Sequence, residues 1–98
     1  TPPPNGPMIS ITSLGVTPKT LTVTVGAQVT FVNNDSRPHF MQSDPHPDHT
    51  DCPEINSVGT LNPGQSRQTG NLTIVRTCGY HDHNDAENAN LRGSIVIQ

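Results

Sequence analysis

The stretch TLTVTVGAQVTFVNND, residues 20–35, decides the fold. In its first half Leu21, Val23 and Val25 alternate with threonines, and its second half, QVTFVNND, repeats the alternation after Gly26. β-Branched and other apolar residues at a period of two are typical of strands with one buried face. The segment therefore predicts two successive half-buried strands separated by a glycine turn.

Shorter runs of the same kind flank this segment. Ten prolines and eight glycines predict many turns and few helices, and a hydrophobic content of 30% without tryptophan leaves valine, isoleucine and leucine to build the core. Many short strands at this spacing indicate a β-sandwich or barrel. The further strands are expected within residues 8–16, 59–66, 70–79 and 91–98.

Length and charge narrow the functional classes. A chain of 98 residues is expected to form one domain, which we place at residues 8–98. The net charge of -3 provides no basic patch for nucleic acid or an anionic membrane, and no apolar run approaches the ~20 residues of a membrane span. Residues 1–7, TPPPNGP, resemble a linker left after a targeting segment or anchor is removed, so we expect an exported, periplasmic or extracellular monomer.

Two polar segments that follow strands concentrate soft and borderline metal ligands. The first spans residues 36–57 and shows no strand periodicity, and the second begins at CGYHDH, residues 78–83. Imidazole and thiolate suit copper and zinc, and they suit calcium or magnesium poorly. The candidate ligands are His39, His46, His49 and Cys52 in the first segment and Cys78, His81 and His83 in the second.

The order of these motifs resembles the cupredoxins, in particular small plastocyanin-like domains. The pattern runs from about Val16 to Gln98 through TLTVTVGAQVTFVNNDSRPHF, LNPGQS, CGYH and LRGSIVIQ. The resemblance implies a cupredoxin-like Greek-key sandwich of about eight strands with a copper site at one end. By position, His39 would be the first ligand, Cys78 the thiolate and His81 the second histidine. It also implies a single-electron carrier with a redox partner protein. We expect no enzymatic activity, because the sequence has no recognisable Ser/His/Asp arrangement, phosphate-binding glycine loop or paired carboxylates on rigid elements.

The sequence departs from that pattern around the expected site. The usual axial methionine is missing, because the corresponding position holds Ala86 or Leu91 depending on the alignment. The segment SDPHPDHTDCP, residues 43–53, lies outside the pattern and adds histidines of its own. These departures favour an alternative role in copper storage, delivery or resistance, with a copper donor or acceptor as partner. Additional ligands or residues supporting them would then be Cys52, His46 and His49, and His83 could replace His81.

The two cysteines leave a third possibility open. In an oxidising compartment they can pair with each other, which would remove the thiolate from any copper site. A Cys52–Cys78 bond would stabilise the fold by about 3–4 kcal/mol in the chain-entropy model. The protein would then be a metal-free binding module closed by a disulfide.

Overall fold

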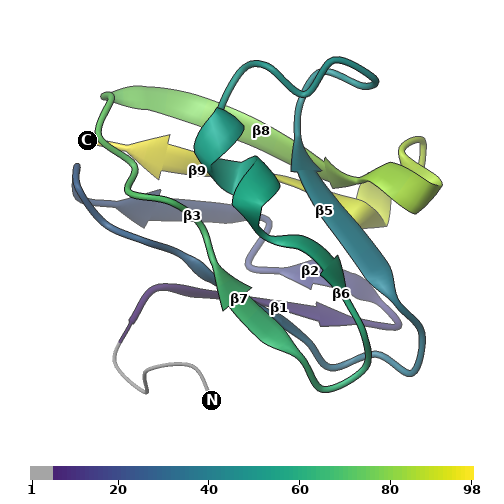
Figure 1. Ribbon diagram of the computed structural model, residues 1–98. Coiled ribbons are helices and arrows are strands. Elements are labelled where there is room, and N and C mark those ends of the chain that lie inside the picture. Colours follow the sequence, from purple (N-terminus) through teal and green to yellow (C-terminus); the bar gives the residue numbers. More distant parts are fainter. Residues whose placement is uncertain (1–5) are drawn as a thin grey trace.

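The computed structural model describes residues 6–98 and arranges them in two packed β-sheets (Figure 1). This confirms the prediction of an all-β sandwich; the described part of the chain has three short 3-10 helices and no α-helix. The four-stranded sheet has the order β2 (Gly15–Thr17), β1 (Met8–Thr12), β4 (Thr30–Asn33) and β7 (Ser66–Gln68). The five-stranded sheet has the order β3 (Thr20–Val23), β9 (Arg92–Ile97), β8 (Arg76–Asp82), β5 (His39–Ser43) and β6 (Gly59–Leu61).

The expected linker at residues 1–7 lies, apart from Gly6 and Pro7, outside the described residues, so the domain boundary stays a prediction. Both sheets are mixed. Strand β1 pairs in parallel with β4, and β3 pairs in parallel with β9, while the remaining pairs are antiparallel. No helix in residues 6–98 is long and apolar enough to cross a membrane.

The core fills the space between the two sheets. Phe31 of β4 and Tyr80 of β8 meet edge to face across it, with ring centroids 5.1 Å apart. Aromatic pairs prefer this geometry because the positive ring edge meets the negative ring face. Burial raises the pKa of Tyr80 well above its ordinary value, so the phenol stays protonated. The other large buried side chains are mostly isoleucine and leucine, including Ile9, Ile95 and Ile97.

Strand β8 does not lie where the sequence predicted it. The predicted strand covered residues 70–79, but Ile74 and Val75 are 53% and 67% exposed and precede the strand. Strand β8 continues through residues expected to form a polar loop, because Tyr80 pairs with Gly93 of β9. Pairing with a neighbouring strand overrides local propensity here, since strand preference depends strongly on tertiary context.

The long segment at residues 36–57 also contains order that its sequence did not predict. It begins with β5, which pairs with both β6 and β8. After Ser43 the chain passes beside the middle of β8, where the Asp44 backbone N–H donates to the Gly79 carbonyl at 3.0 Å. It then forms the 3-10 helix η1 (Pro53–Ser57), which anchors itself through the buried side chain of Ile55.

Candidate metal centre

The alternation of side chains along β8 separates the predicted ligands. Successive side chains in a strand point to opposite faces of the sheet. Cys78, Tyr80 and Asp82 share the face that contacts the other sheet, whereas His81 points to the outer face. On β5, His39 shares the face of Met41, which lies opposite Asp82 in the ladder. The structure therefore places His39 and His81 on opposite faces of the same sheet.

The prediction that Cys78 is a free thiolate ligand is wrong. Cys78 is bonded to Cys52, with their Cα atoms 5.8 Å apart, and the described residues contain no free cysteine. The reason lies in the length of β8, which continues to Asp82 and leaves Cys78 in mid-strand at 1% exposure. The alternative of a Cys52–Cys78 disulfide is confirmed, and it also removes Cys52 from the candidate ligands.

His39 is held by carboxylates on both sides. Its Nδ1 lies 2.6 Å from Asp82 Oδ2 and its Nε2 lies 2.9 Å from Asp35 Oδ2. Both ring nitrogens of this buried side chain are therefore occupied, which leaves no lone pair directed at a metal shared with Cys78 and His81. The hydrogen bond with His39, aided by the backbone N–H of Ser36, holds the pKa of Asp35 below its ordinary value.

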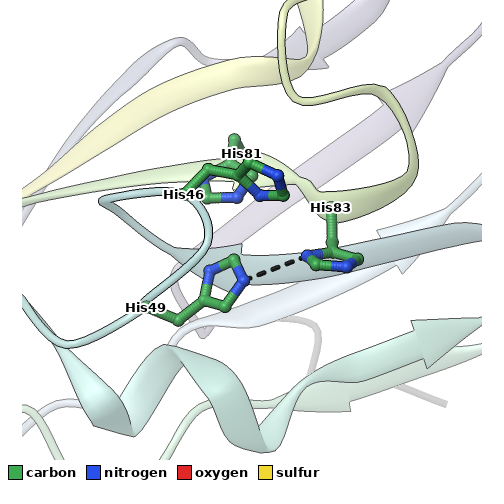
Figure 2. Close-up of side chains that lie close together, drawn as sticks. All are labelled: His46, His49, His81 and His83. Carbon is green, nitrogen blue, oxygen red and sulfur yellow. Dashed lines mark hydrogen bonds between the residues drawn. The ribbon is translucent and has the colours of Figure 1, made fainter.

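The other four histidines converge on the outer face of the five-stranded sheet (Figure 2). His46 and His49 come from the loop after β5, His81 comes from β8, and His83 begins the 3-10 helix η2 (His83–Asp85). One ring nitrogen from each lies within 4.8 Å of the others. The structure thus unites His81 with the three histidines that the sequence offered as additional or alternative ligands.

One ring nitrogen of His81 is hydrogen-bonded to a carboxylate, and the other has no hydrogen-bond partner among the described residues. Its Nδ1 lies 2.6 Å from Asp44 Oδ1, so the carboxylate fixes the tautomer with the proton on Nδ1. The side chain is fully buried, and no polar group among the described residues hydrogen-bonds its Nε2. Burying a lone pair without a hydrogen-bond partner costs about 1–3 kcal/mol of folding free energy. A ligand bound to this nitrogen would recover part of that cost. A carboxylate–histidine pair of this kind is the usual support of a metal-bound imidazole.

A hydrogen bond also fixes the tautomer of His49. The Ser43 carbonyl lies 2.8 Å from its Nδ1, which makes Nδ1 the donor and leaves the lone pair on Nε2. That Nε2 lies 3.0 Å from His83 Nδ1 in the arrangement of Figure 2. The backbone of His49 has a φ of 56°, an uncommon conformation for a residue other than glycine. Two of the four imidazoles therefore present a defined Nε2 to the centre of the cluster.

The cluster fits a first-row transition metal. Metal–nitrogen bonds of 2.0–2.1 Å in a tetrahedral site place neighbouring ligand nitrogens about 3.3 Å apart. The four nitrogens lie within 4.8 Å of one another, so they would approach by at most about 1.5 Å to reach that separation. Imidazole donors suit Cu(II), Zn(II) and Ni(II). The carboxylate of Asp44 would offset part of the charge of the ion through His81.

Sequence reasoning named all four histidines but missed Asp44. Asp44 lies 37 residues from His81 in the sequence, and only the loop crossing β8 brings the two together. Gly79 permits that approach, because a Cβ at residue 79 would collide with the Asp44 carboxylate. A lone aspartate before a proline gives no signal of this role, so only the three-dimensional structure could identify it.

No protein-family model and no curated protein matches this chain. Solved structures do match it in fold. A purple cupredoxin from Nitrosopumilus maritimus is 18% identical with a TM-score of 0.72, covering 94% of this chain and 99% of that one. Amicyanin from Paracoccus versutus is 14% identical with a TM-score of 0.78 (99% and 85%), and plastocyanin from Dryopteris crassirhizoma is 16% identical with a TM-score of 0.70 (93% and 99%). Together with the two-sheet topology, these similarities show that the chain has a cupredoxin-like fold.

Proposed function

We propose that this protein binds copper as Cu(II) through His46, His49, His81 and His83, and that it stores or delivers the ion. The observation that carries the proposal is the buried Nε2 of His81, which has no hydrogen-bond partner within residues 6–98 and belongs to a cluster of four ring nitrogens within 4.8 Å. Asp44 and the Ser43 carbonyl support it by fixing the tautomers of two ligands.

Copper is favoured over the other metals for two reasons. Affinity for nitrogen ligands rises to a maximum at Cu(II) in the first-row series, above Zn(II). The fold is shared with copper proteins, among them an amicyanin variant, 19% identical over 95% of this chain, whose structure is described with Cu(I). The exported location proposed from the sequence would bring the protein into contact with copper donors or acceptors outside the cytoplasm.

Copper handling accounts for the ligand set better than the carriage of single electrons. Thiolate and thioether ligands favour Cu(I), whereas imidazoles also hold Cu(II) well, so loss of Cys78 to the disulfide shifts the preference toward the oxidised ion. A four-imidazole site also lacks the sulfur that gives blue copper its intense colour. A redox partner protein is therefore a weaker expectation than a copper donor or acceptor.

The test is a Cu(II) titration of the disulfide-bonded protein, followed by EPR and visible spectroscopy. We expect one Cu(II) per chain with nitrogen hyperfine structure and only a weak visible band. The variants His81→Gln and His49→Ala should each lower the affinity at least about tenfold, as removal of a ligand requires. Asp48→Asn, in the same loop but exposed, is the matched control and should bind like the parent.

Two results would contradict the proposal. An intense sulfur-to-copper band would mean that the disulfide had opened and a thiolate bound the ion. A folded protein that takes up no Cu(II), with zero free thiols, would favour the metal-free module closed by the Cys52–Cys78 bond. In that case the hydrogen bond between His49 and His83 would be a structural contact that no metal ion replaces.

A further inference from the structure

The disulfide occupies a specific place relative to the histidine cluster. Cys52 follows His49 by three residues, and Cys78 precedes His81 by three residues. One partner thus ends the loop that carries His46 and His49, and the other lies in the strand that carries His81. A single covalent bond joins the two chain segments that each supply half of the proposed ligands.

We propose that Cys52 and Cys78 are positioning residues of the metal site, so that metal affinity and disulfide stability depend on each other. The inference rests on the proposed function, since it concerns how the same histidines are assembled. Neither sulfur touches the metal in this arrangement. The bond acts by limiting where the loop at residues 44–52 can lie relative to β8.

The remaining contacts show why the bond matters for the loop. At its beginning, Asp44 is attached to β8 by its backbone bond to Gly79 and its carboxylate bond to His81. At its end, a bond from the partly exposed guanidinium of Arg76 to the Asp51 carbonyl, 2.7 Å long, accompanies the disulfide. The loop end is also held by the Cys52 N–H, which donates to Ser43 Oγ at 2.8 Å, and by the ion pair of Arg76 with Glu54 at 3.0 Å, so the disulfide is the one covalent attachment among several weaker ones.

The His49–His83 hydrogen bond joins the loop to η2 after β8, and further contacts are internal to the loop or join it to η1. The His49 N–H donates to the Pro45 carbonyl at 2.6 Å, and Asn56 donates to the His49 carbonyl at 2.8 Å. These bonds shape the loop without fixing its distance from His81. A loop freed at one end gains conformations that metal binding would have to remove, which lowers the affinity.

The dependence must run in both directions. If the disulfide raises the affinity for the metal by a given factor, the bound metal raises the stability of the disulfide by the same factor.

Reduction by a dithiol transfers two electrons and two protons to the sulfurs, yielding two thiols on the protein and one disulfide in the reductant. Both sulfurs are buried, so the loop must lift from β8 before a reductant can reach them. The oxidised protein would therefore hold the ion, and reduction would favour its release.

The first experiment compares Cu(II) affinity between the disulfide-bonded protein and the double variant Cys52→Ala/Cys78→Ala. Alanines are used because free thiols would themselves bind or reduce copper. We expect the double variant to bind at least about fivefold more weakly, within the usual range of couplings between sites. Val16→Ala, a core truncation in β2 of the other sheet, is the control for general destabilisation and should keep the parent affinity.

The outcomes separate this inference from the proposed function. Equal Cu(II) affinity in the parent and the double variant would overturn the positioning role while leaving the copper site intact. Absence of binding in the parent as well would overturn the proposed function itself.

A second measurement decides the matter if the double variant does not fold. The parent disulfide is reduced with a phosphine, which becomes a phosphine oxide as water supplies its oxygen and the thiol protons. A phosphine reaches the buried sulfurs only when the loop opens, and a metal that binds the closed loop lowers the open population. Saturating Zn(II), which has no redox chemistry of its own, should therefore slow the reduction in the parent. It should have no effect in His46→Ala/His49→Ala. An unchanged rate in a parent shown to bind Zn(II) would overturn the inference.

Discussion

Asp44 shows how one side chain outside the ligand set can govern a site. Its carboxylate holds Nδ1 of His81 at 2.6 Å and directs the vacant Nε2 into the cluster. Substitution of such partners typically costs 10–100-fold in metal affinity. We therefore expect Asp44→Asn to weaken Cu(II) binding by about that factor while the fold is retained, as competition titration and circular dichroism would show. Equal affinity for Asp44→Asn and the exposed control Asp48→Asn would refute this role.

Asp35 gives a residue-scale prediction about acid stability. The hydrogen bond with His39 lowers its pKa from the ordinary value of 3.8, so ionised Asp35 is favoured in the folded state. Its stabilising contribution is present above the unfolded pKa and is lost as the pH falls through the lower, folded value. Urea unfolding between pH 5 and pH 2 should show a shallower loss of stability in Asp35→Asn than in the parent. Parallel curves would contradict the assignment.

At the scale of the element, Gly79 is the position where β8 accepts the loop. A methyl group there would displace the Asp44 carboxylate, whose flexible end can move at little cost to the fold. We expect Gly79→Ala to keep most of its stability but to bind Cu(II) at least about tenfold more weakly, because His81 loses its partner. Gly70→Ala is the control, since its Cβ would make only ordinary contacts with Glu54. Similar losses of affinity in both variants would argue against the mechanism.

The same strand marks the limit of what the sequence could predict. The alternation in residues 20–35 predicted strands that the structure contains as β3 and β4, and the final strand was also expected. The start of β8 was misplaced because Ile74 and Val75 imitate a strand yet are exposed. Its end was also misplaced, because β8 continues to Asp82, and this put Cys78 at the predicted end of a strand when it lies in mid-strand beside Ile95.

The histidines could be recognised as candidates from their residue type alone, but their grouping could not. Which of them meet depends on the side of the sheet to which each one points. His39 and His81 follow strand signals in similar ways, and the pairing of Met41 with Asp82 is what puts them on opposite faces. A shift of one residue in strand register exchanges the two faces, so a ligand set assigned from spacing depends on register.

At the scale of the molecule, the site is confined to the five-stranded sheet and the loop attached to it. Strand β8, the loop at residues 44–52 and η2 hold the four proposed ligands, and the other sheet provides none of them. The chain-entropy model assigns about 3.5 kcal/mol to a disulfide that closes a loop of this length. This part of the sandwich is therefore held together covalently before any metal binds.

Metal binding should add to that stability in a way that depends on concentration. A ligand that binds only the folded protein adds about 2.7 kcal/mol to the free energy of unfolding at a hundredfold excess over its dissociation constant. For a domain of this size, that corresponds to a rise of about 10–20 °C in the melting temperature. Calorimetry of the disulfide-bonded protein with and without Cu(II) should detect it. His81→Gln, which we expect to bind at least about tenfold more weakly, should show at most about half of that rise at the same copper concentration. A Cu(II)-induced rise of equal size in His81→Gln would mean that the ion stabilises the fold from somewhere other than the cluster.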